Sequence, residues 1–243
     1  MGGRPMQHQN KNEVSPSTVR EGNDENEMEM EMLGISKSSE KVKKVAVAAI
    51  MASLSVAVTP IAAGIPRIPG FGIAIFDPIS LFWMIAFLIG GFWVGLVSMI
   101  TGAIMLNFFD PTPIFGPLLK FLATFPMVVL PWLAVRKTGD KRHSRLLSVA
   151  AKVAQRKEPS HQGGIILSGE RVFGALMMVS YLIRISMMVP VNLVVVPFIW
   201  GVTDAGFIIT YTLILNTLQS FWDALIPFIV VHRTPVFRNY GMW

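Results

Sequence analysis

The chain has 243 residues, of which 52% are hydrophobic and 15% are charged, and its mean hydropathy is +0.54. Soluble domains carry about 25% charged residues, so this composition excludes an ordinary soluble fold and indicates an integral membrane protein. The net charge of +6 is typical of a membrane protein with basic cytoplasmic loops, and we expect no nucleic-acid partner.

The first 40 residues differ from the rest of the chain because they are hydrophilic and acidic. A secretory signal peptide has a basic start followed by an apolar core, which this stretch lacks. Low hydrophobicity and like charges predict a disordered tail over residues 1–40. We expect residues 41–235 to form one membrane domain in the lipid bilayer and residues 236–243 to form a short C-terminal tail.

A run of about 20 apolar residues spans the hydrocarbon core of a bilayer. Runs that approach this length predict helices over about residues 45–63, 78–89, 92–108, 115–135, 172–199 and 207–231. The second run is short, and Gly90-Gly91 predicts a tight turn or a sharp break before the third. Prolines inside the fourth and fifth runs predict a kink and interruptions, because proline cannot donate to the helical hydrogen-bond ladder.

Basic residues are concentrated in alternate connections between these runs. Lys41, Lys43 and Lys44 precede the first run, and residues 136–171 contain nine Lys and Arg. The loops on the opposite side contain acidic residues and one arginine, Arg67. The positive-inside rule therefore places both termini and the 136–171 loop in the cytoplasm. The predicted fold is an all-α bundle of six transmembrane helices in the plasma membrane.

Two further features concern the membrane interface. Residues 142–157 fit either a basic amphipathic helix on the inner leaflet or a solvated charged linker. Aromatic residues are frequent near the ends of the apolar runs, and we expect most of them to lie in interfacial belts. Phe76 and Phe108, at the outer ends, are candidates for stacking on a flat ligand.

Polar residues inside the apolar runs are energetically costly and usually face the bundle interior or a cavity. Arg184 lies midway along the fifth run, and Tyr181 shares its helical face. Asn192 lies two turns further on, and Lys120 begins the fourth run. These residues are candidates for a buried polar site.

On the sixth run, Asn216, Gln219 and Asp223 follow at i, i+3 and i+7 and therefore share one helical face. Arg184 and Asp223 either neutralise each other as a packing bridge or help to line a pocket for a polar, ring-bearing ligand. The two interpretations are compatible. A third interpretation makes Asp223 an anchor at the cytoplasmic end, because it lies close to His232 in the sequence.

Small residues four positions apart allow two helices to approach closely in lipid. The first run contains Ala48-x-x-x-Ala52 and Ala49-x-x-x-Ser53, and the third begins with Gly91-x-x-x-Gly95. The pattern fits packing within the chain or a partner interface. The four histidines lie far apart and cysteine is absent, so we expect no metal site and no cofactor.

Several of these residues recur in the order of a known family. They are Ala48 and Ala52, Asp77 before an apolar run, the Gly90-Gly91 break, Asn107, Gly116, Asn192 before Pro197, and Asn216. Over about residues 45–235, the chain resembles the S component, or substrate-binding subunit, of an energy-coupling factor (ECF) transporter, and most closely the riboflavin-binding branch. It departs from that branch at Lys120, where an Asn is usual, at Trp222-Asp223 in place of a Lys-Gly pair, and in the longer 136–171 loop.

The resemblance implies a membrane protein that binds a vitamin from outside under a gate formed by residues 65–76. In the branch that it is most like, this vitamin is riboflavin or a related flavin. Docking on a transmembrane coupling (T) subunit driven by two ABC-type ATPase subunits would use Ala48 and Ala52. The implied substrate-binding residues are Asp77, Asn107, Lys120, Tyr181, Arg184, Asn192, Asn216 and Gln219. Lys120 and Arg184 would suit an anionic or a carbonyl-rich ligand.

Other functions are weighed against this one. The chain lacks the phosphate-binding G-x-x-x-x-G-K-[ST] motif and has no two acidic residues on one intramembrane face, so we expect neither an ATPase nor an intramembrane enzyme. The remaining alternatives are an S component for a different vitamin or heterocycle and a membrane scaffold without a ligand.

Overall fold

The computed structural model describes residues 37–65, 67–68, 73–74, 76–110, 112–140, 166–234, 236 and 242. Of the tail predicted to be disordered over residues 1–40, residues 1–36 lie outside the described residues, whereas Lys37–Glu40 belong to a helix, so the prediction is wrong for these four. The predictions for the 142–157 segment and for most of the 65–76 loop also lie outside the described residues. Residues 43–243 form one compact unit. The described part of this unit is almost entirely helical, which confirms the helical prediction, apart from a two-residue antiparallel ladder between β1 (Arg67–Ile68) and β2 (Ile73–Ala74).

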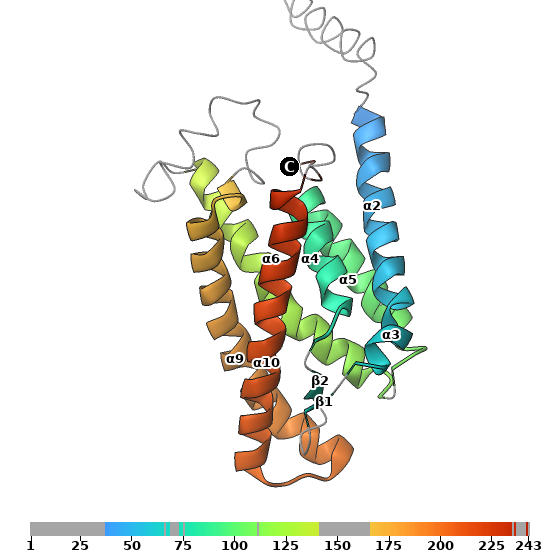
Figure 1. Cartoon of the computed structure of the whole chain (residues 1–243), viewed down its shortest axis with the longest axis vertical. Helices are drawn as coiled ribbons and strands as arrows, with labels where there is room; N and C mark the ends of the chain where they lie inside the picture. The colour runs from blue at the N-terminus through green and yellow to red at the C-terminus, as the bar shows by residue number, and fades with distance from the viewer. Residues whose placement is uncertain are drawn as a thin grey trace, which may run out of the picture. The chain divides into compact units, whose positions relative to one another are not determined.

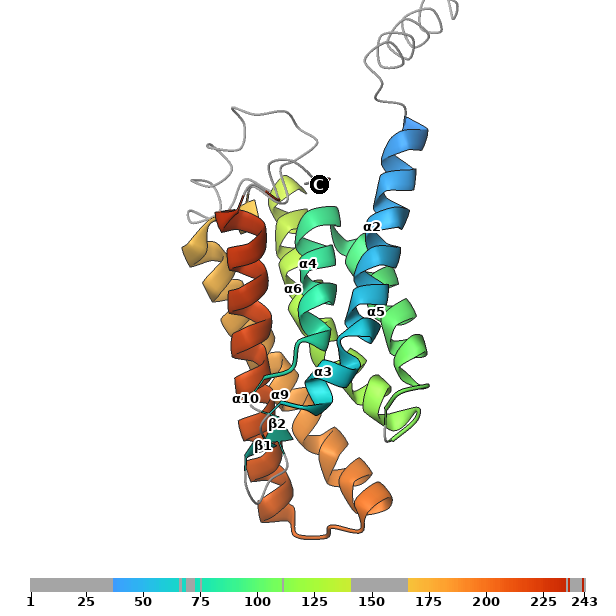
Figure 2. The same cartoon turned by 45° about the vertical axis from the view of Figure 1, so that its right-hand side comes forward.

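The helices follow one another in the predicted order. They are α2 (Lys37–Ala57), α3 (Thr59–Ala63), α4 (Ile79–Gly90), α5 (Phe92–Leu106), α6 (Phe115–Asp140), α9 (Glu170–Trp200), α10 (Ala205–Phe228) and the π-helix η2 (Ile229–Arg233). From Lys43 of α2 onward, the long helices α2, α4, α5, α6, α9 and α10 run alternately down and up in Figures 1 and 2.

Within the described residues, four helical stretches are long and apolar enough to cross a membrane, by length and composition. They are Lys41–Ala62, Phe115–Lys137, Glu170–Trp200 and Ala205–Arg233. Helices α4 and α5 are apolar but contain 12 and 15 residues, which corresponds to about 18 and 22 Å of helix. The hydrocarbon core is about 30 Å thick, so neither of these two helices crosses it by its helical length alone.

Helices α4 and α5 form a tight hairpin around Gly91. This residue has φ 83° and ψ −173°, a conformation that is essentially restricted to glycine. Gly95 then packs directly on the facing helix, because a Cβ atom there would lie 2.7 Å from the Cβ of Phe87. The predicted turn at Gly90-Gly91 is therefore a reversal of chain direction.

Helix α4 is the centre of the fold. Ten of its 12 residues are buried, and it packs against α5, α6 and α10. A helix that is hydrophobic on every side is expected to be covered on every side. Helix α4 is also hydrogen-bonded to α2, because the indole N–H of Trp83 donates to the Ser55 hydroxyl at 3.1 Å. Ala48 of α2 packs near Ala86 of α4 and Val94 of α5.

Helix α9 is continuous through Pro190 and Pro197, so the predicted interruptions near these prolines are wrong. A proline inside a helix removes one backbone hydrogen bond, and a helix in lipid can continue through it with a bend. Figure 2 shows the orange half of α9 diverging from α10, so that the two helices are far apart where the short turn joins them. Asp204 caps α10 by accepting from the backbone N–H groups of Gly206 at 2.8 Å and Phe207 at 3.1 Å.

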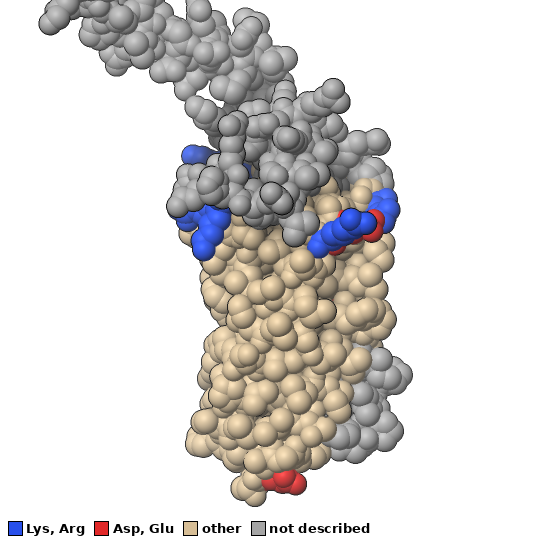
Figure 3. Space-filling model, turned by 90° about the vertical axis from the view of Figure 1, so that its left-hand side faces the viewer, with Lys and Arg blue, Asp and Glu red and all other residues tan. Residues whose placement is uncertain are grey.

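Exposed charged side chains lie at the two ends of the helices. The C-terminal end of α6, the N-terminal end of α9 and η2 lie at the same end of the bundle and carry Arg136, Lys137, Arg171 and Arg233. Asp204 begins α10 at the opposite end. Figure 3 shows a broad uncharged belt between these ends on the face that it presents. This pattern supports a helical membrane protein.

The close contact in the α4–α5 hairpin can be tested with a matched pair of glycine variants. We expect Gly95→Ala to lower the thermal unfolding temperature in detergent, because the added methyl group meets the Phe87 backbone at 2.9 Å. Overpacking of this kind costs about 1–3 kcal/mol. Gly174 of α9 has open space around it, so Gly174→Ala should leave the temperature unchanged or raise it. Equal effects of the two variants would contradict the hairpin contact.

Candidate functional site

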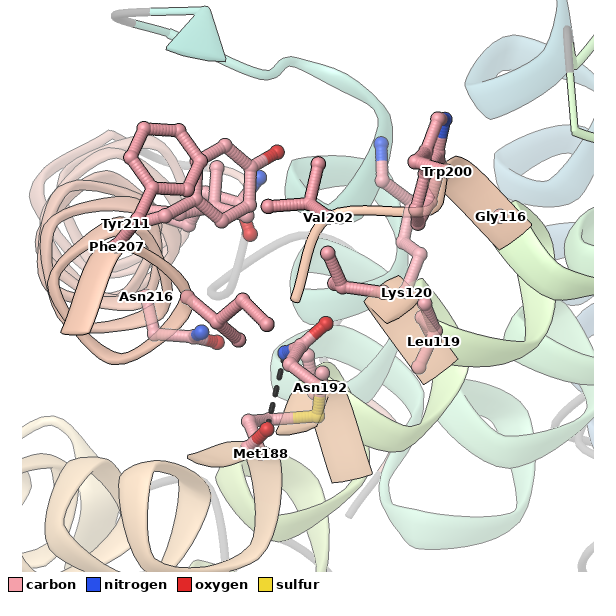
Figure 4. A pocket seen from close by; sticks show the side chains of 15 residues that line it. Gly116, Leu119, Lys120, Met188, Asn192, Trp200, Val202, Phe207, Tyr211 and Asn216 are labelled. Carbon is pink, nitrogen blue, oxygen red and sulfur yellow. Dashed lines mark hydrogen bonds between the residues drawn. The ribbon is translucent and has the colours of Figure 1, made fainter. Parts of the chain in front are cut away.

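A cavity of about 370 Å³ lies between α6, α9 and α10. It is located where α9 and α10 diverge, at the end of the bundle opposite to the basic residues. Its volume is at the lower end of the range of small-molecule sites, about 300–1,000 Å³. Figure 4 shows its lining side chains, which come from the beginning of α6, the end of α9, the Trp200–Asp204 turn and the first half of α10.

Each helix contributes to the cavity through residues one turn apart. On α9, the lining residues Met188, Asn192, Val196 and Trp200 follow at steps of four, which places them on one face. The Asn192 side chain donates its Nδ2 hydrogen to the carbonyl of Met188 at 2.9 Å. A carbonyl can only accept, so the Oδ1 atom of Asn192 remains as an acceptor, and Figure 4 shows it on the side away from Met188.

Aromatic and amide groups of α10 line the opposite wall. Phe207 and Tyr211 supply aromatic surface, and Asn216 and Gln219 supply amides. Trp200, at the end of α9, adds a third aromatic ring to the lining. Aromatic faces pack well against flat rings, while a few fixed polar groups determine the orientation of a ligand. The wall is therefore suited to a small planar molecule with polar edges.

Directly behind this wall lies a buried ion pair between α9 and α10. The guanidinium Nη1 of Arg184 lies 3.1 Å from Oδ2 of Asp223, and each of the two side chains is 1% exposed. Ser80 of α4 donates its hydroxyl to Oδ1 of Asp223 at 2.5 Å. Nη1 of Arg184 also contacts the sulfur of Met127, on α6, at 3.2 Å.

The same guanidinium holds two of the lining amides. Nε of Arg184 donates to Oδ1 of Asn216 at 2.8 Å, and Nη2 donates to Oε1 of Gln219 at 2.7 Å. Burying an ion pair is favourable only when its remaining donors and acceptors are satisfied. The hydrogen bonds to Asn216 and Gln219 help to satisfy the remaining donors of Arg184. They also connect the ion pair to the cavity wall.

A second ion pair lies at the edge of the cavity. Lys120 of α6 lines the cavity and pairs with Asp77, just before α4. The other carboxylate oxygen of Asp77 accepts from the backbone N–H of Ile79 at 3.0 Å and so caps α4. Because Lys120 and Arg184 each face a carboxylate, neither presents an uncompensated charge to the cavity.

The structure brings together six of the residues expected to bind substrate. Lys120, Asn192, Asn216 and Gln219 line the cavity, and Arg184 and Asp77 each contact a lining residue. Tyr181 does not line it, and its hydroxyl instead shares a hydrogen bond of 2.9 Å with that of Thr217 on an exposed face.

Asn107 also lies away from the cavity lining, in the connection between α5 and α6. Its Oδ1 accepts from the backbone N–H of Ile114 at 2.6 Å, and its Nδ2 donates to the carbonyl of Ala103 at 2.9 Å. Ile114 has φ 72°, which is unusual for a β-branched residue. Asn107 therefore holds a strained connection in place.

The proposed docking residues Ala48 and Ala52 are 3% and 2% exposed within the chain itself. Their small side chains pack inside the bundle, which was the alternative to a partner interface. Ala49 and Ser53, the second small pair of α2, are exposed.

Some residues of the cavity and the ion-pair cluster have no sequence signal that points to this site. Trp200 and Tyr211 belong to the aromatic residues that the sequence predicts for interfacial belts, and nothing in the sequence marks Phe207 or Ser80. Helical spacing identifies the face on which a residue lies. It does not identify the neighbouring helix, so the contact between Ser80 and Asp223 had no sequence signal.

The chain was compared with known proteins in three ways. No protein-family model, no curated protein and no solved structure matches it.

The buried ion pair can be tested by removing one partner or both. We expect Asp223→Ala to lower stability by about 3–5 kcal/mol, because it leaves the Arg184 cation buried and unpaired. The double variant Arg184→Met/Asp223→Leu should recover much of this loss. Thermal unfolding in detergent measures both. As a control, Glu170→Ala removes a surface pair with Arg233 whose side chains are 63% and 62% exposed, and it should have little effect. A double variant less stable than Asp223→Ala would contradict the pairing.

Proposed function

We propose that the chain is the substrate-binding subunit of an ECF-type vitamin uptake transporter, with riboflavin or a related flavin as its ligand. The observation that carries the proposal is the cavity between α6, α9 and α10, which combines aromatic surface with fixed amides and a paired lysine. The resemblance described above suggests the transporter class. The cavity gives a ligand-free scaffold less support, since a scaffold has no need for it.

The chemistry of the lining suits a flavin-like ring. Such a ring has two apolar faces and an edge with carbonyl oxygens and a ring N–H. Phe207 and Tyr211 could contact a face. The Asn192 oxygen could accept from a ring N–H, and Lys120 and Gln219 could donate to carbonyls. A different heterocyclic vitamin with the same kind of edge is the alternative ligand.

The proposed topology has six membrane crossings with both termini in the cytoplasm. Four stretches have the required length, and the α4–α5 hairpin would provide the other two crossings together with its flanking segments. The proposed location is the plasma membrane. The positive-inside rule then places the end of the bundle that carries Arg136, Arg171 and Arg233 in the cytoplasm. The cavity would then lie toward the outside, where an uptake subunit meets its substrate.

Uptake would require partners, because the chain has no phosphate-binding motif of its own. The proposed partners are a transmembrane coupling subunit and two ABC-type ATPase subunits. The burial of Ala48 and Ala52 shifts the proposed contact on α2 to the exposed residues Ala49 and Ser53, where small side chains permit close helix approach.

Ligand binding can be tested on the purified protein. We expect it to carry a yellow, fluorescent flavin, or to bind added riboflavin in detergent. Asn192→Leu should weaken binding about tenfold or more, because it removes a cavity hydrogen-bond group. Tyr181→Phe, outside the cavity, should bind normally. Mass spectrometry of a denatured extract would identify another vitamin, whereas a protein that binds no small molecule would contradict the proposal.

The coupling role can be tested with two adjacent substitutions on α2. Ala49→Trp should leave ligand binding and thermal stability unchanged but block cellular uptake, because it enlarges the exposed face. Ala48→Trp should instead destabilise the protein itself, since Ala48 is 3% exposed. Normal uptake by a stable Ala49→Trp variant would remove this face from the docking role.

A further inference from the structure

The hydrogen-bond inventory of Arg184 determines how the neighbouring amides are oriented. A guanidinium has five N–H donors and no acceptor. Two of its nitrogens point at Asn216 and Gln219, at 2.8 and 2.7 Å. Each amide must therefore present its oxygen to Arg184, whereas an amide in a neutral environment could adopt either of its two flipped orientations.

This orientation determines what the wall offers to the cavity. The Nδ2 group of Asn216 donates to the carbonyl of Thr212 at 2.8 Å, so both ends of this amide are engaged within the protein. Gln219 lines the cavity, and its oxygen is bound to Arg184. The group that Gln219 can still offer to a ligand is its NH₂ donor.

The charges near the cavity are compensated in the same arrangement. Asp223 neutralises Arg184, and Asp77 neutralises Lys120. Among the described lining residues, Gln219 and Lys120 thus offer donors that their partners fix, Asn192 offers a fixed acceptor, and Trp200 and Tyr211 add an indole N–H and a hydroxyl. An anionic ligand would bring an unpaired charge into this largely apolar lining, which is costly.

We propose that Arg184 is a positioning residue that sets the hydrogen-bond polarity of the cavity without touching the ligand. The ligand class is an uncharged ring that presents carbonyl acceptors to Gln219 and Lys120. Of the two ligand types that the sequence suggested, anionic and carbonyl-rich, this selects the carbonyl-rich one. The proposal rests on the proposed function in one respect, that the cavity is the substrate site. It does not require the substrate to be a flavin.

A purely structural role for Arg184 predicts a different behaviour. If the residue only holds α9 to α10, its replacement weakens the binding of every ligand in parallel with the loss of stability. A positioning role changes the preference between ligands of equal size and opposite edge polarity. The ratio of two affinities therefore separates the two roles.

The experiment uses the purified full-length protein at pH 7 and two probes with the same ring. Lumazine (2,4-dioxopteridine) carries two carbonyls, and 2,4-diaminopteridine carries two amino groups in their place. We expect the wild-type protein to bind lumazine about tenfold or more tightly by calorimetry, the size of effect that one well-placed hydrogen bond produces. Arg184→Lys keeps a cation for Asp223 but loses the fork that holds both amides. Arg184→Lys should therefore reduce the preference for lumazine over 2,4-diaminopteridine severalfold. Gln219→Met should reduce it as well.

Tyr181→Phe is the control, and its preference should equal that of the wild-type protein. Failure of the wild-type protein to bind either probe, or to prefer lumazine, overturns the proposal. An unchanged ratio in stable Arg184→Lys and Gln219→Met variants also overturns it. A preference for lumazine without any riboflavin binding would reject the flavin assignment while retaining the polarity of the cavity, so the two failures are distinguishable.

A second measurement needs no ligand and no substitution of Arg184. The chain contains no cysteine, so Gln219→Cys provides a single thiol at the proposed donor position. A small methanethiosulfonate reagent should label it, whereas Ser180→Cys, at a position that is 0% exposed and outside the lining, should remain unlabelled. If the thiol of Gln219→Cys resists labelling as strongly as that of Ser180→Cys, the proposal is overturned, even if Arg184→Lys fails to fold.

Discussion

The ion pair between Arg184 and Asp223 is the interaction on which the rest of the structure depends. In a bilayer, apolar side chains gain little by leaving lipid for one another, so polar bonds and close packing have to specify which helices meet. Arg184 belongs to α9 and Asp223 to α10, while Ser80 from α4 and Met127 from α6 complete the cluster. Four helices therefore have their rotation and register set around two charged groups, because any slip leaves a charge unpaired in a medium without water.

The same cluster lies behind the cavity, so the ion pair and the cavity lining share side chains. Gln219 satisfies Arg184 with its oxygen and faces the cavity as a lining residue. An exposed amide on a surface loop would have to be ordered by the ligand, at a cost in conformational entropy. The Gln219 amide is instead ordered by folding, because its oxygen accepts a hydrogen bond from Arg184. Preorganised groups of this kind improve affinity, since less conformational entropy is lost on binding.

The sequence was sufficient to predict the elements that depend on local periodicity, and insufficient for those that depend on which helices are neighbours. The spacing of Asn216, Gln219 and Asp223 places them on one face of α10, and a bridge from Arg184 to Asp223 was one of the interpretations that the sequence left open. The bonds of Arg184 to Asn216 and Gln219 were not predicted. The pairing of Lys120 with Asp77 was not foreseen, since it joins α6 to the start of α4. The predicted interruptions at the prolines of α9 were wrong, because a helix in lipid can continue through a proline and sequence alone does not show whether it does. Ala48 and Ala49 differ by one position and face opposite environments, which a pattern of small residues cannot distinguish.

The distribution of packing also indicates which part of the bundle is able to change when a ligand enters. Helix α4 is buried on nearly every side, and moving it would break the bonds of Ser80 to Asp223 and of Trp83 to Ser55. Beyond Asn192, in contrast, α9 separates from α10, and Trp200 is 51% exposed. Rearrangement costs least where few buried contacts are lost. If the cavity binds a ligand as proposed, we expect the ends of α9 and α10 around the Trp200–Asp204 turn to move on binding, while the ion pair and α4 stay in place.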